Sequence, residues 1–460
     1  MKIRLSTVVI WVIALTSFLI TFSLENWKKD EKVVEWDVHN YYGYLPLCFI
    51  YKDLKIEKDY SYSKDAFGNG RYWIWSEKTK DNRNVIKTTM GLAYLYAPFF
   101  FLADFIAPLT NYPANGFSEP YKICLLLSSL VYLIIGLFYT RKIIAAIQPS
   151  DTLISITLLA LGLGTNLLAY SSSFAPMPHV YNFALIAIFI YHTIQWHTSQ
   201  AFKHIIWIGV MLGIITIVRP TNGLIALFFL FYHVESKATF NHKYQLIKTN
   251  CCKLLFIIPI VFLCWVPQFL YWKLVTGNYI YYSYNDEGFF FNNPQIWRGL
   301  FSFRKGWFIY TPLMLIASIG IFFLRNRWAS FQWGITIFYL LNSYIVFSWW
   351  CWWYGGSFGQ RSMIDSYALM SIPLSAFTYW VLQKGILIKI IFGVLLGFFI
   401  WLNIFQTYQF EHKSLHYDSM SMKLYFKQFG KLEPIKDFDS NLQFIDYDEA
   451  KYEGRKPSQK

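Results

Sequence analysis

The sequence predicts an all-α protein that crosses a membrane about eleven times. The 460-residue chain is 55% hydrophobic and 21% aromatic, and its charged share of 15% is below the roughly 25% of soluble domains. Apolar stretches of roughly 20 residues, the length of a membrane-spanning helix, recur along the chain. Positive charges collect in the short segments between these stretches, as they do in oriented membrane proteins.

Hydropathy places the spans in order along the chain. The first follows Lys2 and Arg4 as a signal peptide would, but Glu25-Asn26-Trp27 is not a small-residue cleavage site, so we expect a permanent anchor. Two short spans meet at a break at Arg219-Pro220. The predicted spans are residues 6–24, 119–140, 152–171, 179–196, 203–218, 220–233, 254–272, 306–324, 329–348, 363–382 and 386–408.

Residues 88–108 are also apolar enough to span, but a span there would move the basic segments 141–142 and 237–253 to the outside. We therefore expect a helix pair in the outer interface, within a first outer loop of residues 25–118. The N-terminus then lies inside and the C-terminus outside. The inner segments carry Lys2, Arg4, Arg141, Lys142, Lys203, Lys237, Lys243, Lys248, Lys253, Arg325, Arg327, Lys384 and Lys389, against Asp151 and Glu235.

The chain divides into a transmembrane domain, residues 1–409, and a polar tail, residues 410–460, expected outside the membrane. The tail is too short for a sizeable core of its own, so we expect a capping segment that is partly ordered at most. A formal charge of +14 would suggest nucleic acid in a soluble protein, but helix orientation accounts for it here, and no nucleic acid partner is expected. No Cys/His spacing predicts a metal site, and free thiols are favoured over a Cys48–Cys351 disulfide.

Polar residues stand beside aromatic ones in four outward segments, residues 25–118, 172–178, 273–305 and 349–362. Arg219 joins them at the outer end of a short span. Aromatic faces pack on sugar rings, and Arg or Lys neutralises phosphate. The pattern therefore indicates a cavity for sugar and phosphate at the outer membrane face.

Several short motifs occupy these segments. They are Trp36–Pro46 (WDVHNYYGYLP), Lys87, Arg219–Asn222 (RPTN), Tyr271-Trp272-Lys273 with Thr276-Gly277, and Trp353–Arg361 (WYGGSFGQR). By their order and sidedness they resemble the GT-C superfamily of integral-membrane glycosyltransferases. Within it, the likeness is closest to bacterial relatives of the protein O-mannosyltransferases and the lipid A aminoarabinose transferase. The resemblance covers most of residues 1–410.

The resemblance implies a polyprenyl-phosphate sugar donor and a glycan, lipid or protein acceptor, which meet among membrane lipid at the outer face of a bacterial inner membrane. It also implies that a carboxylate in the first outer loop activates the acceptor hydroxyl, and Asp37 has that position. The chemistry itself asks for one base and for cations beside the departing phosphate. Some GT-C enzymes need a divalent cation and others do not, so that cofactor stays open.

The role of Asp37 as the catalytic base has competing interpretations. Asp37 could only cap an interfacial helix, as Asp often does, and Glu35 is the alternative base. His39 would either hydrogen-bond the acceptor or be solvated at the interface. His179, at the outer entrance of the fourth span, would either line the cavity or be a satisfied interfacial histidine.

Two cations are candidates for the donor phosphate. Lys87 stands where the aminoarabinose transferase uses a lysine, although Lys87-Thr88-Thr89 departs from that family's Lys-Pro-Pro run. An ordinary snorkelling lysine is the alternative. Arg219 needs an anionic partner at its depth, either phosphate or an outer-loop carboxylate. Pro220 also starts a helix whose N-terminus favours anions.

The segment 349–361 combines tryptophans with a glycine-rich run. The tryptophans fit a membrane-interface belt, whereas the glycines would let the backbone approach a ligand. We expect Tyr354, Gln360 and Arg361 to bind the donor, and Arg361 to pair with Asp365 four residues later. Asp286-Glu287 are expected to be solvated loop residues.

A lipid-linked oligosaccharide flippase or polysaccharide polymerase is the second hypothesis, and a non-catalytic scaffold is the third. A flippase should carry polar or basic residues through the depth of its central helices, whereas here they gather at the outer ends. A scaffold would not need Asp37, Arg219 and Arg361 on one side. The sequence leaves the sugar and the acceptor open.

Overall fold

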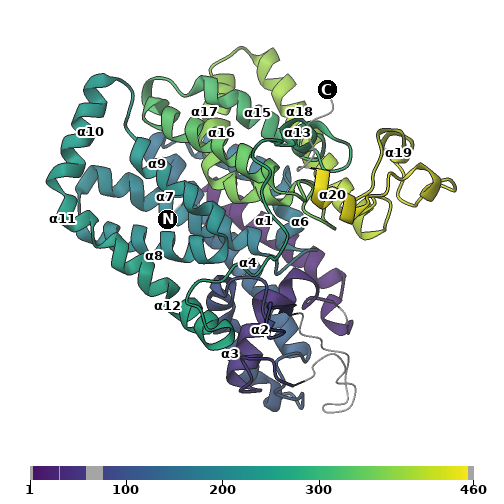
Figure 1. Cartoon of the computed structure of the whole chain (residues 1–460). Coiled ribbons are helices and arrows are strands. Elements are labelled where there is room, and N and C mark those ends of the chain that lie inside the picture. The colour runs from purple at the N-terminus through teal and green to yellow at the C-terminus, as the bar shows by residue number, and fades with distance from the viewer. Residues whose placement is uncertain (1–3, 31, 59–75, 454–460) are drawn as a thin grey trace.

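Helices make up most of the structure in Figure 1, a computed structural model that describes residues 4–30, 32–58 and 76–453. Within these ranges the strands are β1 (Glu77–Lys78) and β2 (Asn84–Val85), which pair antiparallel. The predicted all-α class is confirmed. The α-helices are α1 Leu5–Ser23, α2 Asp37–Phe49, α3 Gly91–Leu109, α4 Glu119–Ile147, α5 Asp151–Leu163, α6 Leu167–Ser171, α7 Pro178–Ser199, α8 Phe202–Val218, α9 Ala226–Phe231, α10 Lys237–Thr249, α11 Cys251–Leu254, α12 Ile257–Thr276, α13 Ile296–Phe301, α14 Trp307–Tyr310, α15 Leu313–Gly320, α16 Gln332–Ser348, α17 Tyr367–Leu382, α18 Ile386–Glu411, α19 Met422–Gln428 and α20 Tyr447–Glu453. The 3-10 helices are η1 Asn26–Lys28, η2 Pro220–Ile225, η3 Ile321–Phe323, η4 Asn326–Phe331, η5 Arg361–Ser366 and η6 Asp439–Asn441.

Among the described residues, five helical stretches are long and apolar enough to cross a membrane. They are Leu5–Lys28, Gly91–Leu109, Glu119–Ile147, Cys251–Thr276 and Ile386–Glu411. The chain is therefore a helical protein with the character of a membrane-embedded one. Other predicted spans fall on shorter or interrupted helices, so the count of eleven stays a prediction. The break at Arg219-Pro220 is confirmed, because α8 ends at Val218 and η2 begins at Pro220.

Residues 88–108 differ from the prediction. The expected helix pair is wrong, because one helix, α3, runs through 19 residues with Pro98 and Pro108 inside it. A proline removes one backbone hydrogen bond, and here the packing of α3 against α2, α4 and α8 supports the helix across that gap.

Helix α7 is the centre of the core. It is apolar around most of its circumference, and nearly all of its residues are buried between α4 and α8, as expected for a helix without a polar face. Gly136 of α4 lets the two helices meet, because a Cβ there would lie 2.4 Å from the Phe183 ring. The 22 residues of α7 span about 33 Å, so the two ends of this helix lie at opposite ends of the bundle.

Side-chain contacts show which helix ends lie together. At one end, Ser17 Oγ of α1 donates to the Ser171 carbonyl 3.0 Å away, shortly before α7 starts, and Lys122 Nζ of α4 donates to the Lys29 carbonyl over 2.7 Å. At the opposite end, Ser6 Oγ donates to Asp151, and His192 contacts His204 with 2.8 Å between their Nδ1 atoms. The start of α7, the end of α1 and the start of α4 therefore share one end of the bundle.

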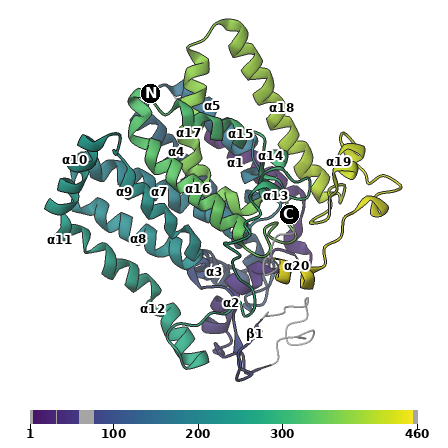
Figure 2. The ribbon, with the colours of Figure 1, turned by 45° about the horizontal axis from the view of Figure 1, so that its top comes forward.

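The C-terminal segment is more ordered than predicted. Helices α19 and α20 lie at one edge of the molecule, and α10 and α11 lie at the opposite edge in both views (Figure 1, Figure 2). Met420, Leu424 and Phe438 are buried and join the main hydrophobic core. The tail needs no core of its own, because it packs its apolar residues against the helices.

Gly91 offers a test of how α3 packs. A Cβ on Gly91 would lie 2.4 Å from the Val218 backbone nitrogen, so the start of α3 lies directly beside the residue before Arg219. We expect Gly91→Ala to lower the free energy of unfolding by about 1–3 kcal/mol through overpacking. Gly393→Ala in α18 is the matched control, because a Cβ there has open space. Equal thermal unfolding of both purified variants would contradict this packing.

Candidate functional site

Four segments far apart in the sequence meet at the end of the bundle where α7 starts. The first turn of α2 brings Asp37, and η5 brings Arg361 and Asp365. The first turns of α7 bring His179 and Asn182, and the junction of α8 and η2 brings Arg219 and Asn222. Polar groups from all four segments contact one another there, so this is the candidate site.

Asp37 pairs with Arg361. The distance from Arg361 Nη2 to Asp37 Oδ2 is 2.9 Å, and the two side chains are 15% and 39% exposed. Trp36 is the N-cap of α2 and makes no side-chain cap hydrogen bond, whereas Asp37 lies in the first turn, where a carboxylate is favourable. Asp37 therefore does more than occupy a helix start: it is accessible and held beside a cation.

Asp365 is a buried carboxylate on which four side chains converge. Its Oδ1 lies 3.0 Å from His179 Nδ1, and its Oδ2 accepts from Arg219 Nη1 at 3.0 Å. Oδ2 also accepts from Asn222 Nδ2 at 2.7 Å and from Asn182 Nδ2 at 3.3 Å. A buried charge is costly unless it is paired and hydrogen-bonded, and this carboxylate is both.

The expected pairing of Arg361 with Asp365 is wrong. Arg361 reaches Asp37, and Asp365 binds Arg219. The physical reason is local: residues 361–366 form the 3-10 helix η5 instead of an α-helix. At three residues per turn, a residue four positions on points to a different face. Arg219 thus has a carboxylate partner, which comes from the predicted span 363–382 and not from an outer loop, and its contact with phosphate stays a prediction.

Aromatic residues surround these charges. The Arg219 guanidinium carbon lies 5.7 Å from the centre of the Tyr354 ring, and the Tyr354 hydroxyl donates to the Val346 carbonyl over 3.0 Å. Tyr41, one turn after Asp37, is buried. Burial, with the added effect of the Asp37 carboxylate, raises the pKa of Tyr41 to about 12, so its hydroxyl stays protonated.

Gln360 and the glycines brace the loop from within. Gln360 is fully buried, its Nε2 donates to the Trp352 carbonyl at 2.9 Å, and its Oε1 accepts from Ser362 at 3.2 Å. Gly359 has φ +58°, and a Cβ there would lie 3.1 Å from the Tyr310 Cβ. The close approach that Gly359 allows is to the protein itself, whereas a Cβ on Gly355 would have open space. Contact of Gln360 with a donor stays a prediction.

Lys87 also has carboxylate partners. Its Nζ lies 2.5 Å from Glu287 Oε1 and 3.8 Å from Glu77 Oε1, and 5.3 Å from the centre of the Tyr284 ring. The expectation that Glu287 is solvated is therefore wrong. No sequence pattern predicted its pairing with Lys87, because the two residues are 200 positions apart in the chain.

The remaining candidates lie at or near the site. Glu35 is partly exposed and pairs with Lys32 over 3.2 Å. His39 is buried instead of solvated, and burial lowers its pKa to about 4, which keeps the ring neutral. His179 is buried and satisfied by Asp365, as one of the two interpretations held. Asn182, which the sequence did not single out, is found only by its contact with Asp365.

A divalent cation would need several carboxylate or histidine ligands grouped together. In the described part of the chain, no three His, Cys, Asp or Glu residues are grouped so that they could hold a metal ion. Asp37 faces Arg361, and Asp365 is enclosed by nitrogen donors.

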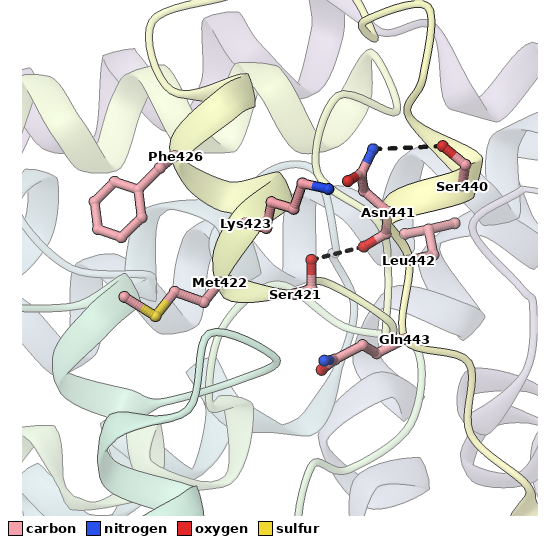
Figure 3. Close-up of a pocket in the computed structure, with 8 residues that line it drawn as sticks. All are labelled: Ser421, Met422, Lys423, Phe426, Ser440, Asn441, Leu442 and Gln443. Carbon is pink, nitrogen blue, oxygen red and sulfur yellow. Dashed lines mark hydrogen bonds between the residues drawn. The ribbon is translucent and has the colours of Figure 1, made fainter.

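An open hollow lies elsewhere, between α19 and the chain from Ser440 to Gln443 (Figure 3). Its polar groups already pair with one another: Ser421 Oγ donates to the Asn441 carbonyl over 2.6 Å, and Asn441 Nδ2 lies 3.4 Å from Ser440 Oγ. None of the predicted site residues lines it.

Comparison with known proteins adds no relative. No protein-family model matches the chain, and no curated protein is significantly similar to it.

The two carboxylates of the site should differ in what their loss does. Asp365→Asn removes a buried charge from Arg219, and breaking a buried pair costs about 3–5 kcal/mol of stability. Asp37→Asn removes a carboxylate that is 39% exposed, against 4% for Asp365, so we expect a smaller loss of stability. Chemical unfolding of both variants in detergent measures this difference. Equal losses would show that Asp365 is not the structural anchor of the site.

Proposed function

We propose that this chain is a membrane glycosyltransferase that moves a sugar from a polyprenyl-phosphate donor to a glycan, lipid or protein acceptor. The observation that carries the proposal is the pairing of Asp37 with Arg361, at the same end of the bundle as Arg219 and Tyr354. A partly exposed carboxylate, two guanidinium groups and an aromatic face together offer a base, cations for phosphate and a surface for a sugar ring.

The chemistry assigns one task to each group. Asp37 accepts the proton of the acceptor hydroxyl while that oxygen attacks the anomeric carbon of the sugar. The bond from this carbon to the phosphate oxygen breaks, and its electron pair stays on the phosphate. Arg219 and Arg361 stabilise the charge that grows there, because fixed cations in a site shielded from water act strongly on developing charge.

The existing ion pairs shape how a donor binds. A phosphate must compete with Asp37 for Arg361 and with Asp365 for Arg219. Competition is easier at Asp37, whose side chain is 39% exposed, than at Asp365, whose side chain is 4% exposed. Once the phosphate takes Arg361, Asp37 loses its cation and its oxygens can receive a proton. Donor binding would thereby prepare the base for the acceptor.

Two contacts, one near each end of α3, support an outer interfacial position for this helix. Gly91, at its start, lies against Val218 at the site end of α8. Asp104, in its last turns, accepts from Tyr121 near the start of α4, which is also at the site end. With both ends of α3 at the same end of the bundle, we propose that it lies along the outer membrane face beside Asp37. The site and the C-terminus then lie outside a bacterial inner membrane, with the N-terminus inside.

Removing the base and removing a phosphate ligand should have different effects. We expect Asp37→Asn to bind the donor at least as tightly as the parent, because the carboxylate that competes for Arg361 is gone. Its turnover should fall about 10²- to 10⁴-fold, the usual contribution of a general base. Arg219→Ala and Arg361→Ala should weaken donor affinity and slow transfer as well. Lysine at either position should rescue poorly, because it cannot make bidentate contacts.

The measurement is titration of a polyprenyl-phosphate sugar, followed by its consumption, with monodisperse protein. Asp81→Asn is the matched control, since Asp81 is exposed between β1 and β2. Near-normal turnover in Asp37→Asn would exclude Asp37 as the base and favour Glu35. Parental donor affinity in both arginine variants would make those arginines structural.

Sidedness can be measured with single cysteines introduced into a background in which the six native cysteines are replaced by serine. Lys436→Cys, in the exposed tail, should react with an impermeant maleimide on intact cells. Lys248→Cys, exposed in α10, should react only after lysis. Protection of the tail position in intact cells would overturn the orientation. Ser63 and Lys460 are also predicted to be on the outer side of the membrane, but neither is among the residues that the structure describes.

A further inference from the structure

The C-terminal segment docks on the loop that carries Tyr354 and Arg361. Cys351, Trp352 and Trp353 of this loop form a buried cluster with Ala450 of α20. The Trp353 and Tyr447 rings lie 5.6 Å apart, and Lys451 Nζ lies 5.6 Å from the centre of the Trp350 ring. In Figure 2, α20 lies against the rest of the molecule, while α19 extends away from it.

Asp418 fastens the tail to itself and to the bundle. Its carboxylate is 4% exposed and accepts from the Tyr447 hydroxyl at 2.6 Å and from Ser419 Oγ at 2.7 Å. His416 Nδ1 lies 3.2 Å from Asp418 Oδ1, and Arg304 donates to the Asp418 carbonyl over 2.7 Å. Burial raises the pKa of Asp418, but the hydrogen bonds from His416, Tyr447 and Ser419 outweigh it and lower the pKa to about 2.

The docked tail also reaches the loop through its backbone. Ser357 N donates to the Tyr417 carbonyl over 3.1 Å, next to Asp418. The Ser357 carbonyl in turn accepts from Lys305 Nζ, and Lys305 is 1% exposed. On its other side the loop is held by the core, where Phe358 N donates to the Tyr170 hydroxyl over 3.2 Å.

Arg361 follows shortly after Ser357 and Phe358, which contact the tail and the core respectively. Its position relative to Asp37 therefore depends on where residues 351–358 lie, and Gln360 transmits that position through its bond to Trp352. The loop turns through left-handed backbone at Gly359 (φ 58°), which glycine adopts freely, and at Tyr354 (φ 57°), where surrounding contacts must maintain the conformation.

We infer that Asp418 and Tyr447 are positioning residues of the site: they hold the tail on the loop of residues 349–361 and so place Arg361 against Asp37. The effect on catalysis rests on the proposed function, whereas the placement of Arg361 by the tail does not depend on it. Neither residue touches the substrate; both act through the loop.

Docking of the tail can be measured by how fast the Cys351 thiol reacts, because this side chain is 8% exposed under the tail. In full-length protein carrying Cys48→Ser, Cys251→Ser, Cys252→Ser and Cys264→Ser, an impermeant maleimide should label Cys351 slowly. Asp418→Asn should speed this labelling several-fold, and Tyr447→Phe should do the same to a smaller extent. Asp439→Asn is the matched control, because Asp439 is exposed in the same tail. Unchanged labelling in both test variants would overturn the docking.

The position of residue 361 relative to residue 37 can be measured by crosslinking, without any assay of sugar transfer. In a Cys351→Ser version of that protein, Asp37→Cys with Arg361→Cys should be joined efficiently by a short bis-maleimide. Adding Asp418→Asn should reduce this crosslinking several-fold, whereas Asp439→Asn should not. Equal crosslinking with and without Asp418→Asn would overturn the inference even if the tail undocks. If Asp418→Asn fails to fold, Tyr447→Phe carries the same comparison.

The catalytic consequence is measured separately. With Asp37 and Arg361 intact, Asp418→Asn should raise the donor KM and lower kcat, because small misplacement of reacting groups costs up to about 10²-fold in rate. Parental kinetics together with reduced crosslinking would overturn the link to catalysis. If the parent transfers no sugar at all, the proposed function fails, while the labelling and crosslinking results still decide the positioning role.

Discussion

The buried carboxylate of Asp365 is the constraint on which the site depends. A charge that is 4% exposed must be matched, and four side chains from the starts of α7 and η2 and the end of α8 match it. That requirement ties η5 to the bundle and fixes the direction of Arg219. Once η5 is fixed at Asp365, its first residue, Arg361, faces the start of α2 and meets Asp37.

The site is therefore close to neutral before anything binds. Arg219, Arg361 and Lys87 each have a carboxylate within 3.0 Å. A phosphate has to displace a carboxylate instead of filling an empty positive pocket. The pair of Asp37 with Arg361 can open at least cost, because its carboxylate is 39% exposed and that of Asp365 is 4% exposed. The same pair contains the proposed base. Donor binding and activation of the acceptor are then two consequences of one exchange of partners.

The sequence predicted the helical class and the break at Arg219, because hydropathy and a proline act locally. It also indicated the segments that meet at the site. It did not predict the partners. The α-helical spacing of Arg361 and Asp365 suggested a pair, but a 3-10 turn separates them. Glu287 and Lys87, or Asp418 and Tyr447, become neighbours only through tertiary packing, to which no local pattern corresponds.

The most direct test of the account is an experimental structure of the protein with a polyprenyl phosphate bound. The account predicts phosphate oxygens within hydrogen-bond distance of Arg219 and Arg361, and an Asp37 carboxylate that has separated from Arg361. A phosphate bound elsewhere, with the Asp37–Arg361 pair intact, would contradict the proposed exchange and the function built on it.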